Sequence, residues 1–197
     1  MPRIRRSFAV AAAALAACTA AALTPGTTAP AAAAGTGPRA VRQGAGEPSL
    51  KGSGKLARQP GDDVRFRLDA HGFADGARGT FFVSHHLGKD WGGYAKGRID
   101  CLLTGGPVAV ATGVVTESHF KNAPGSGLPE IGDLRGKRFG FTVLDGGKGD
   151  RLGYSWAIDG LPKNSVGTCL GSAPCETLEK GGFTVHHWMP PREPAGR

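Results

Sequence analysis

The 197-residue chain lacks the fixed-spacing motifs by which many enzymes and metal sites are identified. It has no H-E-x-x-H and no C-x-x-C motif, so these two common zinc-binding patterns are excluded. The stretch 52-GSGKL-56 lacks the earlier glycine and the Ser or Thr after lysine that a phosphate-binding loop requires. The stretch 153-GYSWA-157 ends in alanine where a nucleophile elbow has glycine, so Ser155 is predicted to be an ordinary strand residue.

The chain also lacks a block of lysines and arginines, although its formal net charge is +8. Three of the positive charges, on Arg3, Arg5 and Arg6, lie close to the N-terminus, and the others are scattered. Nucleic-acid-binding modules typically carry a basic patch or a basic motif interleaved with aromatic residues, so we expect no nucleic-acid partner. An anionic polymer of the cell envelope is compatible with this charge, but a mildly basic solvated surface is the simpler interpretation.

No window shows a sustained helical period, and 33 glycines with 14 prolines interrupt the chain too often for long helices. Apolar and polar residues instead alternate, as in 63–70, where Val64, Phe66 and Leu68 share one face and Arg65 and Arg67 the other. This period of two is typical of a strand with one wet side. The same alternation recurs in 79–86, 97–104, 107–117, 137–144, 151–158 and 182–188, and less clearly in 51–58.

These segments predict an all-β domain of roughly eight antiparallel strands. Most are joined by short Gly-rich turns, such as the two-residue hairpin signal Gly105-Gly106, which favours a meander that closes into a barrel and so removes its edges. A two-sheet β-sandwich is the alternative. Two longer connections, 118–135 and 160–180, lie outside the meander, and loops of that length are functional or poorly ordered.

Residues 1–34 are predicted to be a secretory signal, because a basic start without acidic residues precedes an Ala-rich apolar run and the small-residue exit 29-APAAAA-34. We expect cleavage near Ala34 and a secreted mature chain without a transmembrane span, since a spanning helix needs about 20 apolar residues. The expected organisation is a signal peptide (1–34), a flexible spacer (35–49), a single β domain (50–188) and a disordered tail (189–197).

Two details of the signal leave the export route and the anchoring open. Arg5-Arg6 followed by Ser7-Phe8 is similar to a twin-arginine signal, although Ala9 and Val10 do not complete that pattern, so the general secretory route stays open. The stretch 15-LAAC-18 is similar to a bacterial lipobox, in which Cys18 would be lipidated and would hold the protein at the membrane surface.

Five stretches place glycines, one cysteine and apolar alternation in a recognisable order: 79-GTFFVS-84, 97-GRIDCLLTGGPVAVATGVV-115, 139-FGFTVLDGG-147, 150-DRLGYSW-156 and 181-GGFTVHHW-188. In this order the chain resembles a group of exported actinobacterial proteins of unknown function. The resemblance covers most of the domain and implies a small secreted β-barrel-like domain. It implies no catalytic residue.

If cleavage removes Cys18, three cysteines remain in the exported chain: Cys101, Cys169 and Cys175. Export exposes them to oxidising conditions, where cysteines are first interpreted as disulfides. A Cys169–Cys175 bond would close only a short loop, whereas a Cys101–Cys169 bond would attach the long late connection to a core strand. The resemblance favours Cys101–Cys169, which leaves Cys175 outside the disulfide.

His85, His187 and Asp145 are the candidate metal-binding or catalytic residues. Continued alternation would point all three inward near strand ends, where imidazole and carboxylate groups could bind a metal or act in acid–base catalysis. The simpler interpretation is that the two histidines bond to the backbone or lie in water. The loop 145-DGGKGD-150 around Asp145 is predicted to be a hairpin connection, with its aspartates capping turn amides.

Trp91 and Tyr94 are the candidate ligand-binding residues. They lie in the stretch 88-GKDWGGYAKG-97, which is interpreted as a Gly-rich turn, and exposed rings there would suit stacking on a sugar or an aromatic ligand. The alternative is that Trp91 folds back and fills one end of the barrel.

Two functions follow from these features. The first is a secreted or envelope-associated, non-enzymatic β-barrel module without a cofactor, which binds an unknown extracellular ligand through its loops or its mouth. The second is a small extracellular hydrolase or metal-dependent enzyme that uses His85, His187 and Asp145. The second requires these three side chains to converge on one cavity.

Overall fold

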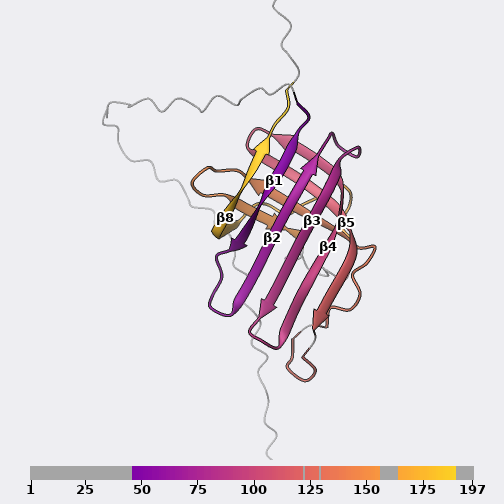
Figure 1. Cartoon of the computed structure of the whole chain (residues 1–197), viewed down its shortest axis with the longest axis vertical. Helices are drawn as coiled ribbons and strands as arrows, with labels where there is room; N and C mark the ends of the chain where they lie inside the picture. The colour runs from indigo at the N-terminus through magenta and orange to yellow at the C-terminus, as the bar shows by residue number, and fades with distance from the viewer. Residues whose placement is uncertain (1–45, 122, 129, 156–163, 190–197) are drawn as a thin grey trace, which may run out of the picture. The chain divides into compact units, whose positions relative to one another are not determined.

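The fold is taken from a computed structural model, which describes residues 46–121, 123–128, 130–155 and 164–189. Each strand pairs antiparallel with the next, and the last pairs with the first, so the eight strands form a closed barrel (Figure 1). This confirms the all-β meander barrel and excludes the sandwich. The strands are β1 (Ser49–Leu56), β2 (Asp62–His71), β3 (Arg78–Leu87), β4 (Trp91–Gly105), β5 (Val108–Lys121), β6 (Arg138–Leu144), β7 (Arg151–Tyr154) and β8 (Glu176–His186).

The expected signal segment with Cys18 and most of the expected spacer and tail lie outside the described residues. Within the described ranges, no helix is long and apolar enough to cross a membrane.

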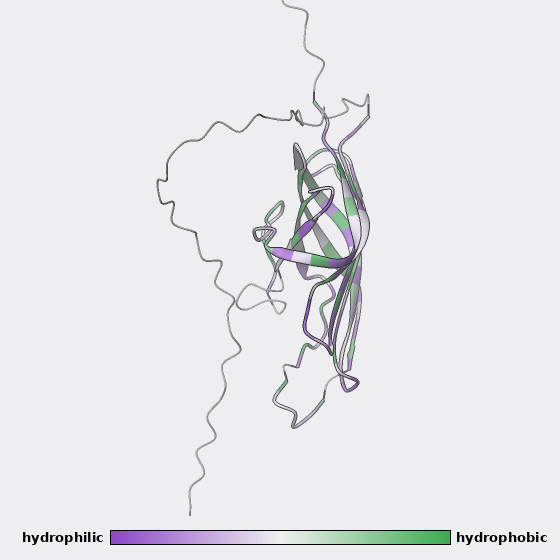
Figure 2. Cartoon of the chain, turned by 90° about the vertical axis from the view of Figure 1, so that its left-hand side faces the viewer, coloured by the Kyte–Doolittle hydropathy of each residue, from purple (hydrophilic) through white to green (hydrophobic). Residues whose placement is uncertain are grey.

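The core forms because the alternating strands turn one apolar face inward. In β2, Val64, Phe66 and Leu68 are buried while Arg65 and Arg67 are exposed, as the pattern predicted. Hydrophobic and hydrophilic residues also follow one another within other strands (Figure 2). The buried set includes large side chains from every strand of the barrel, so the interior is a packed core.

Strands β4 and β8 begin earlier in the chain than the alternation predicted. Strand β4 begins at Trp91, inside the stretch interpreted as a turn, and β8 begins at Glu176, inside the expected long connection. Glycine permits the first extension, because a Cβ at Gly92 would lie 2.4 Å from the His85 carbonyl oxygen. A Cβ at Gly93 would lie 2.0 Å from the His119 carbonyl oxygen. These glycines therefore allow close approach of neighbouring strands rather than a chain reversal.

The hairpin between β4 and β5 is present, but one residue later than predicted. Gly105 pairs with Val108, so the two turn residues are Gly106 and Pro107. Gly106 has a φ of 59°, the left-handed conformation that glycine adopts without a steric cost.

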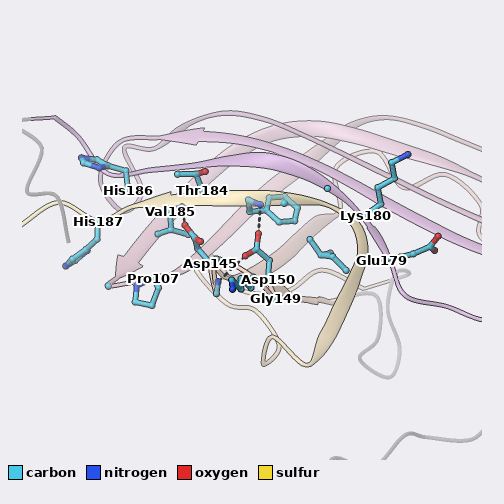
Figure 3. A pocket seen from close by; sticks show the side chains of 18 residues that line it. Pro107, Asp145, Gly149, Asp150, Glu179, Lys180, Thr184, Val185, His186 and His187 are labelled. Atoms are coloured by element: carbon cyan, nitrogen blue, oxygen red, sulfur yellow. Dashed lines mark hydrogen bonds between the residues drawn. The ribbon is translucent and has the colours of Figure 1, made fainter. Parts of the chain in front are cut away.

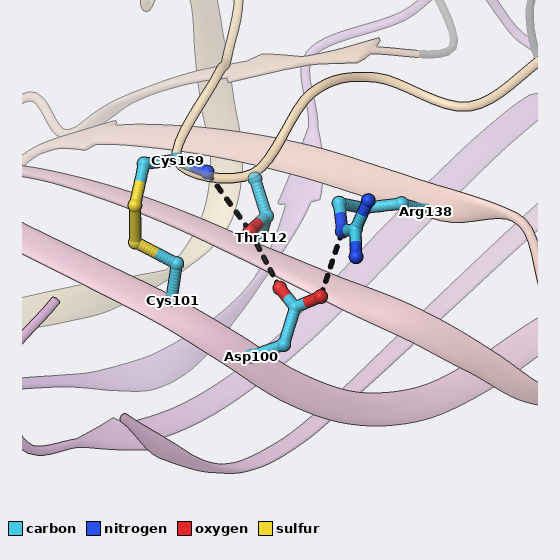
Figure 4. The surroundings of a disulfide bond; sticks show 5 residues. All are labelled: Asp100, Cys101, Thr112, Arg138 and Cys169. Atoms are coloured by element: carbon cyan, nitrogen blue, oxygen red, sulfur yellow. Dashed lines mark hydrogen bonds and ion pairs between the residues drawn. A yellow bond between two sulfur atoms is a disulfide. The ribbon is translucent and has the colours of Figure 1, made fainter. Parts of the chain in front are cut away.

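The predicted disulfide joins Cys101 in β4 to Cys169 in the segment before β8, with Cα atoms 5.4 Å apart (Figure 4). Cys175 takes no part in a disulfide and is exposed. The bond attaches the segment before β8 to the wall formed by β4 and β5.

A chain of polar contacts supports the same attachment (Figure 4). The Cys169 N–H donates to Thr112 Oγ1 at 3.2 Å, and that hydroxyl donates to Asp100 Oδ1 at 2.6 Å. The second carboxylate oxygen of Asp100 accepts from Arg138 Nε at 2.7 Å. Thr112 is fully buried, so its hydroxyl needs both of these partners.

Candidate functional site beside strand β8

The barrel is closed unevenly, because β8 is well paired on one side and poorly paired on the other. It pairs with β1 from Ser49↔His186 to Leu56↔Leu178. With β7 it forms only two residue pairs, Arg151↔Thr177 and Leu152↔Glu176. Strand β8 then continues past the start of β7. Its backbone from Leu178 to His186 is about 30 Å long at the rise of a strand, and on that side it pairs with no strand of the described residues. This gap is the seam.

Two carboxylates partly take the place of the missing strand (Figure 3). Asp150 Oδ2 accepts a hydrogen bond from the Phe183 N–H at 2.6 Å, and Asp145 Oδ2 accepts one from the Val185 N–H at 3.1 Å. Asp150 is buried, and its other oxygen accepts from the Gly146 N–H at 3.0 Å. Hydrogen bonds to ionised acceptors are stronger than neutral ones, so two side chains can satisfy a strand edge at these points.

The loop that carries these carboxylates connects β6 to β7, as predicted for 145–150. Gly147 has a φ of 74°, and a Cβ at Gly146 would lie 2.6 Å from the Gly149 carbonyl oxygen. Glycine is therefore needed for the tight path of the loop. The predicted capping of turn amides is correct for Asp150, but the amide that Asp145 binds belongs to β8.

The carbonyl groups of Phe183 and Val185 complete the edge. In an extended strand the N–H and C=O of one residue point to the same side, so these carbonyls face the seam together with the N–H groups held by Asp150 and Asp145. Within the described part of the chain, neither carbonyl has a hydrogen-bond partner on the seam side. Two acceptors of a strand edge are thus open.

The seam forms an open groove of about 1110 Å³. One side is the β8 backbone from Leu178 onward, and the other is the loop 145–150, with Gly106 and Pro107 at one end. Two lysines line the groove, Lys148 and Lys180, and neither forms an ion pair with a described residue. Glu179 also lines it, but its carboxylate is bound by Lys55 at 2.7 Å. The groove therefore carries two lysines without an ion pair and, on its loop side, the carboxylates of Asp145 and Asp150, which are held by backbone N–H groups.

The structure does not bring the three candidate metal or catalytic residues together. Asp145 bonds to Val185, and the His187 Nδ1 atom lies 3.0 Å from Thr104 Oγ1, at the end of the barrel where β8 finishes. His71 of β2 lies at this same end, because it pairs with the first residue of β1. His85 instead pairs with Val64 of β2, which is seven residues, or about 20 Å of strand, away from His71. No group of three metal-binding side chains occurs among the described residues. The expectation that these residues converge on one cavity is wrong, because alternation gives the face of a residue but not the end of the barrel.

His85 has its own surroundings at the opposite end. Its Nε2 atom lies 2.8 Å from Asp62 Oδ1, and its ring packs edge-on against Trp91 at 5.2 Å. Burial lowers the pKa of His85 below its usual value, and the Asp62 carboxylate offsets part of this shift. Nearby, Arg58 donates to the Tyr154 hydroxyl at 3.0 Å, and burial raises the pKa of Tyr154.

Trp91 and Tyr94 are not in an exposed turn, so that expectation is wrong. Both lie in β4, where Trp91 is only 4% exposed and fills the end of the barrel beside His85, as the alternative interpretation had it. Tyr94 is half-buried on the outer face, stacks on Phe82, and donates its hydroxyl to Glu117 at 2.7 Å. Of these two rings, Tyr94 is the one that a ligand on the outer wall could approach.

Asp150, Phe183 and Lys180 were not singled out from the sequence as site residues. The available signal was two carboxylates bracketing a Gly-rich loop beside an alternating segment, which is also the pattern of an ordinary hairpin.

Comparison of the chain with protein-family models, with curated proteins and with solved structures gives no match. The site must therefore be interpreted from its own geometry.

Proposed function

We propose that this chain is an exported, non-enzymatic binding module that takes an extended polypeptide segment into the seam beside β8. The observation that carries the proposal is the unpaired β8 edge, which lines a groove of about 1110 Å³. The Cys101–Cys169 disulfide supports function in an oxidising compartment, in agreement with the predicted secretory signal. The enzyme alternative loses its support, because His85 lies at the opposite end of the barrel from Asp145 and His187.

An extended polypeptide fits this edge because its backbone presents donors and acceptors at the spacing of a strand. Its N–H groups would donate to the carbonyls of Phe183 and Val185, and β8 would gain a second neighbour. Adding a strand to an exposed edge is a common way to bind peptides, in which the backbone supplies affinity and alternate side chains supply specificity. A sheet edge left open in this way also favours unwanted pairing unless it is covered.

Asp145 and Asp150 provide that cover in the free protein. Their carboxylates hold the N–H groups of Val185 and Phe183, which a ligand strand would otherwise bind. In the complex, ligand carbonyls replace the two carboxylates, so the exchange keeps both donors satisfied. Gly146, Gly147 and Gly149 allow the loop between the two aspartates to change its path.

The charge of the groove selects the ligand further. Lys148 and Lys180 line it without an ion pair to any described residue, so we expect acidic side chains placed beside these two lysines to bind more tightly than basic ones.

Binding of a short capped peptide of alternating valine, threonine and glutamate to the intact domain, followed by amide NMR, tests the proposal. We expect the largest shift changes and slower exchange at Phe183 and Val185, and dissociation constants at least about tenfold higher for a twin peptide whose alternate backbone nitrogens are methylated. Methylation removes the donors and leaves side chains and charge unchanged. Equal binding of the twin, or shift changes away from β8, would contradict strand addition.

Lysine variants distinguish an effect of the lysines in the groove from an effect of the net charge of the protein. Lys148→Glu with Lys180→Glu should weaken binding of the acidic peptide, whereas Lys121→Glu, an exposed lysine at the far end of β5, should leave it unchanged. An equal loss in Lys121→Glu would assign the effect to net charge rather than to the seam.

A further inference from the structure

A second surface lies on the outer wall of β2, β3 and β4, where an apolar ring stands among charged side chains. Phe82 is 36% exposed although it is on the wet face of β3. Tyr94 stacks on it with ring centres 5.8 Å apart and planes 21° apart, and the Tyr94 hydroxyl is held by Glu117. Phe82 is thus held in place by a neighbour that is itself anchored, which is a rigid arrangement for an exposed ring.

Two arginines flank this ring without an acidic partner. The strand register places Arg67 opposite Phe82 and Arg98 opposite Thr80, which lies two residues before Phe82 on the same face. Both side chains are exposed, and neither forms an ion pair within the described ranges of the chain.

Lys96 and Arg65 of the same wall, and Lys51 of the neighbouring β1, are paired with carboxylates. Lys96 binds Glu117 at 2.8 Å, and Lys51 binds Asp69 at 3.2 Å. Arg65 is held by the carboxylate of Asp63. The acidic groups beside Arg67 and Arg98 are therefore already neutralised, and these two arginines supply the excess positive charge of this surface.

The arginines and the ring border one hollow of about 330 Å³. Its exposed lining comes from Arg67, Thr80, Phe82, Lys96, Arg98 and Thr116. Tyr94 does not line the hollow, so it supports Phe82 from outside while Phe82 itself faces the hollow. A ring, two hydroxyls and two unpaired guanidinium groups thus surround one shallow site.

We propose that this hollow binds an acidic polysaccharide. The apolar face of a sugar ring packs on Phe82, the hydroxyls of Thr80 and Thr116 bond to sugar hydroxyls, and the acid groups bind Arg67 and Arg98. Guanidinium groups bind carboxylates through two parallel hydrogen bonds, which suits sugar acids.

The occupant follows from the charge and the layout of the surface. Arg67 and Arg98 lie two strands apart and are offset by two residues along the strands, about 12 Å between their backbones, so a ligand with several acid groups reaches both more readily than a single small anion does. A nucleic acid typically binds a longer basic stripe, and a membrane surface binds a larger apolar patch than Phe82 provides. The site lies on a different wall from the seam, so it does not depend on peptide binding.

Titration of the intact domain with polygalacturonate, and with dextran as the uncharged polymer, tests the proposal. We expect salt-dependent binding to polygalacturonate only, and a loss of at least about tenfold in Arg67→Gln/Arg98→Gln. Phe82→Ser should weaken binding and leave the salt dependence unchanged, because it removes the ring without removing charge. All three positions are exposed, so circular dichroism should show an unchanged fold.

The matched control is Arg151→Gln/Lys121→Gln, which removes the same charge from two exposed positions outside the hollow. An equal loss in this control would overturn the proposal in favour of a general charge effect. Tighter binding of double-stranded DNA, or of vesicles containing anionic lipid, with the same dependence on Arg67 and Arg98 would assign the surface to those ligands instead. Absence of polygalacturonate binding would also overturn it.

Discussion

His85 experiences two opposing influences where it meets the end of the barrel. Packing against Trp91 removes its ring from water, which disfavours the charged form, and the Asp62 carboxylate 2.8 Å away favours that form. Arg58 and His86 add positive charge nearby and disfavour protonation further. Burial has the largest effect, so the pKa of His85 lies below its ordinary value of 6.5.

This direction fixes how the stability of the barrel depends on pH. Because the unfolded chain binds the proton more readily than the native one, the stabilisation is complete above about pH 6.5 and is lost as the pH falls towards the native pKa of His85. We expect the free energy of unfolding, measured by urea titration, to fall between about pH 7 and pH 5. His85→Gln should reduce this dependence, and His119→Gln, at an exposed position, should not. An unchanged slope in His85→Gln would contradict the assignment.

Strand β8 shows why a closed barrel can still expose an edge. Strand β7 begins at Arg151, opposite Thr177, and the chain before it forms the loop 145–150 instead of continuing along β8. Barrel closure was expected to remove all strand edges, but here carboxylates satisfy two N–H groups, and the carbonyls of the same two residues have no partner on this side among the described residues. The segment that precedes β8 in the chain is held to the barrel wall by the Cys101–Cys169 disulfide.

The Cys101–Cys169 disulfide should make a large contribution to the free energy of unfolding of the domain. Its cysteines are 68 residues apart, for which the chain-entropy model gives about 4 kcal/mol. We expect Cys101→Ser/Cys169→Ser to lower the free energy of unfolding, measured with guanidinium chloride, by about 2–4 kcal/mol. Cys175→Ser should change it by less than about 0.5 kcal/mol, as at other surface positions. A similar loss in both variants would argue against this account of the disulfide.

Aromatic rings connect opposite walls of the barrel and make its core continuous. Phe141 of β6 lies 5.1 Å from Phe81 of β3 and 6.2 Å from Phe66 of β2, measured between ring centres. Phe66 in turn lies 5.0 Å from the ring of Tyr154 in β7. Strands that are far apart in the sheet order therefore depend on the same side chains, so we expect the barrel to unfold as one unit.

The Phe141→Ala variant tests whether the barrel unfolds as one unit. Removal of a fully buried phenylalanine should cost about 3–5 kcal/mol, and hydrogen exchange should accelerate in β2 and β3 as much as in β6. Leu103→Ala, at a residue that is 46% exposed, should have little effect on either measurement. Continued protection of β2 in Phe141→Ala would show that the walls unfold separately.

The all-β class, the meander order and most strands could be predicted from the sequence, because alternation and glycine turns are local properties of the chain. In β2, Val64 and Phe66 are inside and Arg65 is outside, as the pattern required. The sequence was less informative at Gly92 and Gly93, because glycine occurs both in turns and where two strands approach closely. These glycines were interpreted as a turn, but they permit close strand packing, and Trp91 lies in the core.

The candidate sites depended on the folded chain. Alternation assigns a residue to a face, but the end of the barrel at which it lies and the strand it faces follow from register and strand length, which are set by contacts distant in the sequence. For this reason Asp145 and His85 were expected together and lie at opposite ends, whereas Asp150 and Phe183 meet across the seam. Arg67 and Arg98 flank Phe82 for the same reason, since only the pairing of β2, β3 and β4 places them beside one ring.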